Sequence, residues 1–340
     1  MTVPLLAVKD LRKIYTRGGG LIRKPAQAVA VQSVSFELHE GDILCMVGES
    51  GCGKSTIGKI LAGVVPPTSG SIFFYGKDMR EMGREAFHRA SLGIQIIHQD
   101  PFASLNPTRT VEQSLSAPLV AHRLARGRAE RRKRLLELLY SVGLAPAEEF
   151  LGKYPHQLSG GQRQRISVAR ALTVDPRVLV SDEATSMVDV SLRVGILNTI
   201  RELGKSRKMA NLFITHDFGV ARYFGNGHRI AVMYLGEIVE SGPTEDVIQR
   251  PQHPYTRMLL SSVPAPDPAK NQARRRMMPR SHEIPDAAHI PDGCSFANRC
   301  PFAVAVCEHK KPPVELLGNR DDRHEVACHL AGQLPADARA

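Results

Sequence analysis

The chain has 340 residues, of which 42% are hydrophobic and 23% charged, an ordinary composition for a globular protein. No run approaches the roughly 20 consecutive apolar residues of a membrane-spanning helix, and the first residues lack the pattern of a secretory signal. We therefore expect a chain that stays in the cytosol, and its net charge of +11 favours anionic partners such as a nucleotide, a nucleic acid or a lipid surface.

The first part of the chain predicts strands that lead into a helix. Residues 3–14 and 29–38 alternate apolar and polar positions, as half-exposed strands do. Residues 42–47 form a short apolar run, which is typical of a strand buried on both faces. A helix is expected over about 55–64, before a pair of prolines that would end it.

The second part predicts helices followed by further buried strands. Residues 100–172 are expected to be mostly helical, and four apolar residues there recur at helical spacing: Leu135, Leu138, Leu139 and Val142. Apolar runs at 178–180, 212–214 and 230–232 then alternate with helical segments. That alternation indicates an α/β fold with a parallel sheet and crossover helices.

A glycine-rich loop between the strand at 42–47 and the next helix matches the P-loop pattern G-x-x-x-x-G-K-[ST]. Its residues are Gly48, Glu49, Ser50, Gly51, Cys52, Gly53, Lys54, Ser55 and Thr56. The glycines let backbone N–H groups form an anion nest, and the helix N-terminus adds partial positive charge. Lys54 can reach the β- and γ-phosphates of a nucleotide, and Ser55 can ligate Mg²⁺. Cys52 is expected to face away from the phosphates and not to act as a nucleophile. The alternative interpretation, a glycine-rich turn that binds nothing, is the weaker one.

Two acidic residues follow the strand at 178–180. Asp182 would bind Mg²⁺ through water, and Glu183 would polarise the attacking water. A solvated strand end is the alternative, but a P-loop in the same chain favours the catalytic interpretation.

A second glycine-rich helix start lies between these two elements. It consists of Leu158, Ser159, Gly160, Gly161 and Gln162. Such a helix start can bind an anion. Two chains arranged head to tail would therefore each present this segment to the nucleotide held by the other, which predicts a dimer closed by ATP.

The motifs and their order resemble the ABC transporter ATPase family, whose signature is the sequence LSGGQ. The resemblance implies a P-loop core over 1–250, with a helical subdomain at about 100–172. It further implies that Gln99 senses the γ-phosphate, contributes to the Mg²⁺ site and touches the membrane subunits.

Three more site residues follow from the same resemblance. His216 would contact the γ-phosphate, and Asp189 would lie in the loop that bridges the two protomers. Tyr15 would stack on the adenine ring.

Two segments narrow the resemblance. The sequence QDPFASLNP at 99–107 and the segment 233–264 resemble the ATPases of oligopeptide, dipeptide and nickel importers, and an insertion near 18–24 resembles the ATPase usually encoded second. The resemblance implies a paralogous ATPase as heterodimer partner, two transmembrane permease subunits, and an extracytoplasmic substrate-binding protein. The chain would then lie at the cytoplasmic face of the cell membrane. Oligopeptides or dipeptides are the expected substrates, with nickel chelates, glutathione and small glycosides as alternatives.

Four cysteines cluster near the C-terminus, in a module at 293–330 within an extension at 251–340: Cys294, Cys300, Cys307 and Cys328. Tight zinc sites favour ligands closer in sequence. Spacing alone therefore leaves a metal site and four reduced thiols equally open. The family resemblance favours a [4Fe–4S] cluster with a structural role, held by these four thiolates.

Two other functions fit part of the pattern. A soluble ABC-type ATPase acting on nucleic acid would suit the basic charge, but such proteins usually carry two cassettes or a long coiled coil, and the arginines at 128–134 read as a solvated helix face. A regulatory cassette without catalysis would not need Lys54, Asp182, Glu183 and His216 together. We therefore expect an ATPase and no nucleic-acid partner.

Overall fold

The computed structural model describes residues 3–17, 26–263, 277–283, 285, 290–317 and 323–334. The strands in these ranges are β1 (Leu6–Arg17), β2 (Ala26–Leu38), β3 (Ile43–Val47), β4 (Ser69–Phe74), β5 (Lys77–Asp78), β6 (Ile94–Ile97), β7 (Val178–Asp182), β8 (Ala210–Thr215), β9 (Arg229–Tyr234), β10 (Glu237–Pro243), β11 (Val314–Leu317) and β12 (His324–Ala327).

The helices in the same ranges are α1 (Lys54–Leu61), α2 (Arg84–Leu92), α3 (Pro101–Ser104), α4 (Val111–Ala121), α5 (Arg128–Ser141), α6 (Glu148–Leu151), α7 (Gly160–Leu172), α8 (Val190–Arg207), α9 (Phe218–Phe224), α10 (Thr244–Gln249), α11 (Pro254–Ser262) and α13 (Ala305–His309), with a 3₁₀ turn η1 (Pro155–Gln157). No helix in the described ranges has the length and apolar composition needed to cross a membrane.

The strands lie in the order β5-β4-β1-β2-β10-β9-β3-β8-β7-β6. The segment from β9 to β6 is parallel, as the sequence predicts, whereas β1, β2 and β4 pair antiparallel and extend the sheet on one side. In register, Val47 lies beside Thr215, and Asp182 lies beside Ile214. The parallel strands β3, β7 and β8 therefore deliver their following residues to one edge of the sheet.

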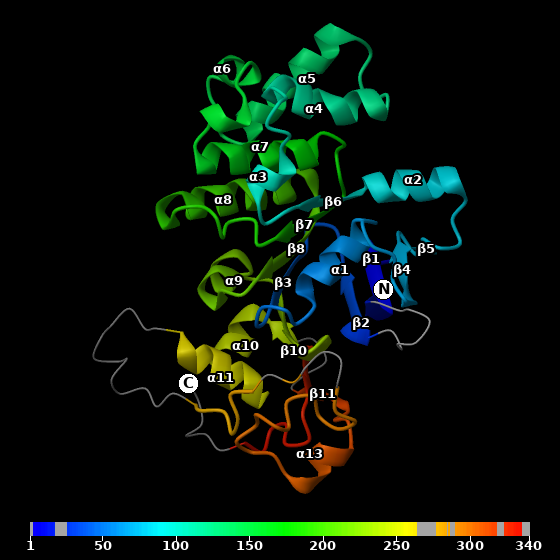
Figure 1. Cartoon of the computed structure of the whole chain (residues 1–340), viewed down its shortest axis with the longest axis vertical. Coiled ribbons are helices and arrows are strands. Elements are labelled where there is room, and N and C mark those ends of the chain that lie inside the picture. The colour runs from blue at the N-terminus through cyan, green and yellow to red at the C-terminus, as the bar shows by residue number, and fades with distance from the viewer. Residues whose placement is uncertain are drawn as a thin grey trace.

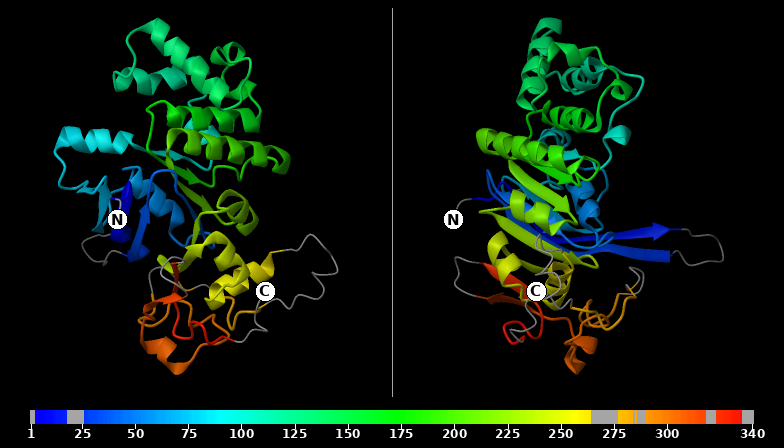
Figure 2. Two further views of the ribbon diagram at one scale, coloured as in Figure 1. Left: turned by 180° about the vertical axis from the view of Figure 1, so that it is seen from behind. Right: turned by 90° about the vertical axis from the view of Figure 1, so that its left-hand side faces the viewer.

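Helices α4 to α7 form a layer beyond the β6 edge of the sheet, at the top of Figure 1. The four apolar residues predicted to share a helical face are buried, three of them on α5 and Val142 directly after it. The predicted helical character of 100–172 is therefore confirmed. Strands β1 and β2 project sideways from the middle of the molecule as a long two-stranded arm (Figure 2).

The C-terminal segment packs against the β10 side of the sheet, at the bottom of Figure 1. Strand β12 pairs antiparallel with β10, with Glu240 opposite Val326. Phe296 and Cys300 belong to the same apolar core as the central strands. The cysteine module thus shares the main core, which its sparse apolar content did not predict. The insertion at 18–24 and most of the proline-rich segment after 263 lie outside the described residues.

Candidate functional site

A cavity of about 510 Å³ opens where β3, β7 and β8 end. Its lining comes from the glycine-rich loop and from three other segments: Ala30, Ser50, Gly51, Gly53, Lys54, Ser55, Thr56, Gln99, Glu183 and His216. The fold therefore brings Gln99, Glu183 and His216 to the phosphate-binding loop, as the sequence interpretation requires.

The loop geometry depends on two of its glycines. Gly53 has φ of 106°, and a Cβ there would collide with the carbonyl oxygen of Ala30. A Cβ at Gly48 would collide with the carbonyl oxygen of Met233. Only glycine therefore lets the loop pass this closely over β2 and β9 before α1 begins.

The ammonium group of Lys54 is hydrogen-bonded to the backbone of the phosphate-binding loop. Its Nζ donates to the carbonyl oxygens of Gly48 at 2.7 Å and Glu49 at 2.9 Å. Cys52 is buried, its Sγ lies 3.5 Å from Lys54 Nζ, and burial raises the pKa of its thiol. A buried thiol of raised pKa is a poor nucleophile.

Ser55 and Asp182 meet on the other side of the loop. The Ser55 hydroxyl donates to Asp182 Oδ1 at 2.8 Å. Burial, with the neighbouring charge of Glu183 as a lesser cause, raises the pKa of the Asp182 carboxyl. A hydroxyl and a carboxylate are hard oxygen ligands of the kind that Mg²⁺ prefers, and a bound cation would offset the cost of burying that carboxylate.

Glu183 is oriented by two polar side chains. Gln99 Nε2 donates to its Oε2 at 2.8 Å, and His216 Nδ1 lies 2.9 Å from its Oε1. The Glu183 backbone has φ of 48°, and its N–H donates to Ile214 of β8 at 2.9 Å. The carboxylate is thereby fixed at the cavity wall, where it can accept a proton from a water molecule.

The LSGGQ segment starts α7 away from this cavity. Ser159 Oγ accepts the Gln162 N–H at 3.3 Å, and Gln162 Oε1 accepts the Ser159 N–H at 3.0 Å. This reciprocal cap fixes the helix start, while Leu158 is buried beneath it. Asp189 is exposed at the start of α8. Neither Asp189 nor any residue of the LSGGQ segment at 158–162 lines the 510 Å³ cavity of its own chain.

Tyr15 lies on β1 and is 39% exposed. It pairs with Ala28 of β2, two residues before the cavity-lining Ala30. Lys13 Nζ lies 5.0 Å from the centre of its ring. The tyrosine does not line the cavity itself.

The four cysteines of the C-terminal module are reduced. Burial, with the charges of neighbouring cysteines as a lesser cause, raises the pKa of Cys294 to about 11 and that of Cys300 to about 12. Those neighbours include Cys307 and Cys328. Within the described part of the chain, no three His, Cys, Asp or Glu side chains gather closely enough to hold a single metal ion.

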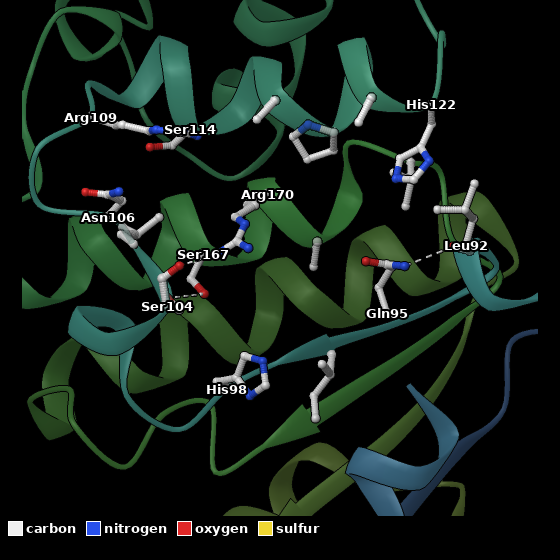
Figure 3. A pocket seen from close by; sticks show the side chains of 17 residues that line it. Leu92, Gln95, His98, Ser104, Asn106, Arg109, Ser114, His122, Ser167 and Arg170 are labelled. Carbon is white, nitrogen blue, oxygen red and sulfur yellow. Dashed lines mark hydrogen bonds between the residues drawn. The ribbon is translucent and has the colours of Figure 1, made fainter. Parts of the chain in front are cut away.

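A second cavity, of about 500 Å³, lies between the helical layer and the sheet. Figure 3 shows side chains from α4 above it, from α7 behind it and from the β6 end below it. Polar groups such as Asn106 and Arg170 mix with Ala117 and Pro118 in its lining. His98 also lines it, and burial lowers the pKa of that imidazole.

Sequence reasoning missed the contacts that hold Glu49. Arg299 donates two hydrogen bonds to its carboxylate, at 2.8 Å to Oε2 and 3.0 Å to Oε1, and the Tyr255 hydroxyl accepts its N–H at 2.9 Å. One indication was present in the sequence. A carboxylate in a phosphate-binding loop would repel the phosphates unless a positive charge lay beside it. Nothing in the sequence indicated that a residue 250 positions away would supply it.

Comparison with known proteins agrees with this geometry. The family described as ABC transporter matches residues 31–186, and the one described as Oligopeptide/dipeptide transporter, C-terminal region, matches residues 239–307. The chain is 40% identical over 332 residues to the Di/tripeptide transport ATP-binding protein DppF of Pseudomonas aeruginosa, covering 97% of this chain and 98% of that protein. The chain belongs to the ATP-binding subunits of ABC transporters.

Two further likenesses bear on this ABC subunit. It is 47% identical over 270 residues to the Glutathione import ATP-binding protein GsiA of Pectobacterium atrosepticum, of which it spans only 42%. The ATP-binding cassette MJ0796, solved as a dimer bound to ADP and Pi, is 29% identical with a TM-score of 0.61, over 70% of this chain and 98% of that one. The predicted P-loop fold and the importer family are therefore confirmed, and ATP hydrolysis is the activity of such subunits.

Proposed function

We propose that this ABC subunit binds Mg·ATP in the 510 Å³ cavity and powers the import of oligopeptides or dipeptides. One observation carries the proposal: the cavity unites the phosphate-binding loop with a carboxylate that both Gln99 and His216 hold. A hydrolytic site needs a phosphate cradle and a positioned acceptor for the proton of water.

The residues then take distinct roles. Lys54 and the loop N–H groups neutralise the β- and γ-phosphates, and Glu183 accepts the proton of the attacking water. Ser55, Asp182 and Gln99 would hold Mg²⁺, which supplies charge neutralisation between the phosphates. His216 contacts the γ-phosphate, and the exposed ring of Tyr15 stacks on adenine.

A second ATPase chain completes each site. The capped helix start at 158–162 does not line the cavity of its own chain, so its anion-binding end is available to a nucleotide held by a partner. The exposed Asp189 would bridge the two chains. We propose a paralogous ATPase as that partner, with this chain as the type usually encoded second. Closure around two ATP molecules and reopening after hydrolysis would drive transport.

The 500 Å³ cavity of Figure 3 is the proposed docking site of a permease subunit. Six residues lie between Gln99 of the nucleotide cavity and Asn106 in this lining, so a helix seated there would respond to changes at the nucleotide. Its mixed apolar and polar lining suits a short amphipathic segment. Attachment to two permeases would hold the chain at the cytoplasmic face of the membrane, supplied by an extracytoplasmic binding protein.

The substrate follows from the relatives. DppF is named for di- and tripeptides and GsiA for glutathione, itself a tripeptide derivative. Oligopeptides or dipeptides are therefore the proposed cargo, and nickel chelates, glutathione and small glycosides are the competing classes.

Substrate-stimulated hydrolysis in the reconstituted transporter tests both cargo and docking. Short peptides added with the binding protein should raise the ATPase rate severalfold, and Ala117→Arg, which places a charged side chain in the cavity, should abolish that stimulation by preventing assembly. ATP binding by the isolated variant reports its folding. Val120→Arg is the matched control, because Val120 is exposed on the same helix and does not line the cavity.

Stimulation by a nickel chelate, glutathione or a glycoside, with none by peptides, would reject the peptide assignment. Full stimulation of Ala117→Arg would instead reject the docking site and leave the cargo assignment intact.

We also propose a [4Fe–4S] cluster held by Cys294, Cys300, Cys307 and Cys328. Support comes from four reduced thiols that influence one another electrostatically inside one small module. Bound there, the cluster would cross-link segments within the module at 293–330, because all four cysteines lie in that module.

Anaerobically purified protein should contain about four iron and four acid-labile sulfide per chain, with a brown colour. Cys328→Ser should lose most of both. Cys45→Ser is the control, because Cys45 is buried in β3 and lies outside the module. A colourless, iron-free chain whose module is folded would reject the cluster.

A further inference from the structure

The phosphate-binding loop contains one acidic side chain, and a residue of the C-terminal module neutralises it. Within residues 48–56, Glu49 is the sole carboxylate. Arg299 meets it through both terminal nitrogens, at 2.8 Å and 3.0 Å. A two-bonded guanidinium–carboxylate pair is both strong and directional.

The pair is built into the core. The Arg299 side chain is only 7% exposed, and the Glu49 side chain is 26% exposed. The hydrogen bonds with Glu49 raise the pKa of Arg299, so its charge is permanent. Solvent and salt screen buried charges less than surface charges. Removing one partner of this pair would therefore leave the other charge without compensation.

Aromatic side chains fix Arg299 in place. Its Nη1 lies 3.4 Å from the Tyr234 hydroxyl, and its guanidinium carbon lies 5.9 Å from the centre of the Phe296 ring. Phe296 packs edge-on against Tyr234 at 5.2 Å and also contacts Tyr255. Tyr255 in turn accepts the N–H of Glu49. Residues beyond 250 therefore hold both the backbone and the side chain of Glu49.

Glu49 also touches the residue that serves the phosphates. Its carbonyl oxygen accepts a hydrogen bond from Lys54 Nζ at 2.9 Å, while Glu49 itself does not line the cavity. A free carboxylate at this point would repel a triphosphate and compete for the Lys54 ammonium group.

We propose that Arg299 is a positioning residue of the ATP site, which neutralises Glu49 and keeps it out of the phosphate cradle. The C-terminal module then contributes a residue that positions the nucleotide site. This inference rests on the proposed role of residues 48–56 in binding ATP.

Nucleotide affinity of the full chain tests the inference. Arg299→Met should weaken binding of a fluorescent ATP analogue about tenfold and raise KM for ATP by a similar factor, with kcat within about twofold. Removing the stranded charge with Glu49→Gln in the same chain should restore most of the affinity. A purely structural loss at Arg299 would not be rescued by a change in the loop.

Arg299→Gln is the second variant in case the methionine disturbs folding. It keeps a hydrogen-bonding group toward Tyr234 while removing the charge, and its KM should rise as much. A KM at the wild-type value in a folded variant would overturn the proposal, and so would weakened binding that Glu49→Gln leaves unchanged. Lys54→Ala in the same titration reports separately on the phosphate site, since loss of binding there with no effect at Arg299 would reject this inference alone.

Discussion

Glu183→Gln should retain ATP binding and reduce the rate of hydrolysis by about 10²- to 10⁴-fold, the usual contribution of a general base. Glutamine keeps the size of the side chain and can still bond Gln99 and His216, which lie 2.8 Å and 2.9 Å from the carboxylate. It cannot take the proton of the attacking water. The measurement is steady-state phosphate release, paired with nucleotide affinity.

The same variant should accumulate as an ATP-bound dimer, because closure requires ATP and reopening requires its hydrolysis. Size-exclusion chromatography with ATP and Mg²⁺ detects this state. Glu202→Gln is the matched control, since Glu202 is an exposed acid on α8 away from the cavity. Normal turnover by Glu183→Gln would show that another group activates the water.

The parallel core and its site were predictable because their signals are local. The apolar run at 43–47 is fully buried as β3, and the loop that follows it shapes the cavity. Parallel strands place their carboxyl ends together, so residues after β7 and β8 had to approach that loop. This is why Glu183 could be assigned to the site from its place after a buried strand, whereas His216 was assigned through the family resemblance.

The remaining contacts join residues far apart in the sequence, and the sequence around each partner does not indicate the pairing. Nothing in the sequence of β10 indicates that β12 will join it, with Glu240 opposite Val326. The same holds for the contact between Arg299 and Glu49, because each residue alone reads as an ordinary charged side chain. The LSGGQ segment is a different case, since its proposed function requires a second chain.

Lys54→Ala should weaken ATP binding by about 10- to 150-fold, the range expected when about 1.5–3 kcal/mol of charge-assisted hydrogen bonding is lost. Lys54 is 5% exposed, and it is the sole lysine or arginine among the described residues that line the cavity. Without its ammonium group, only backbone N–H groups and the helix dipole would face the phosphates. The affinity of a fluorescent ATP analogue measures the change.

Lys59→Ala separates this effect from a general loss of positive charge. Lys59 lies in the last turn of the same helix and is exposed, so its removal should change the affinity less than about threefold. ATP-dependent pairing should fail in Lys54→Ala and persist in the control, because a partner chain can close only on a nucleotide that the loop holds. Unchanged affinity and pairing in Lys54→Ala would mean that the triphosphate binds elsewhere, and the roles proposed for Ser55, Asp182 and Glu183 would fall with it.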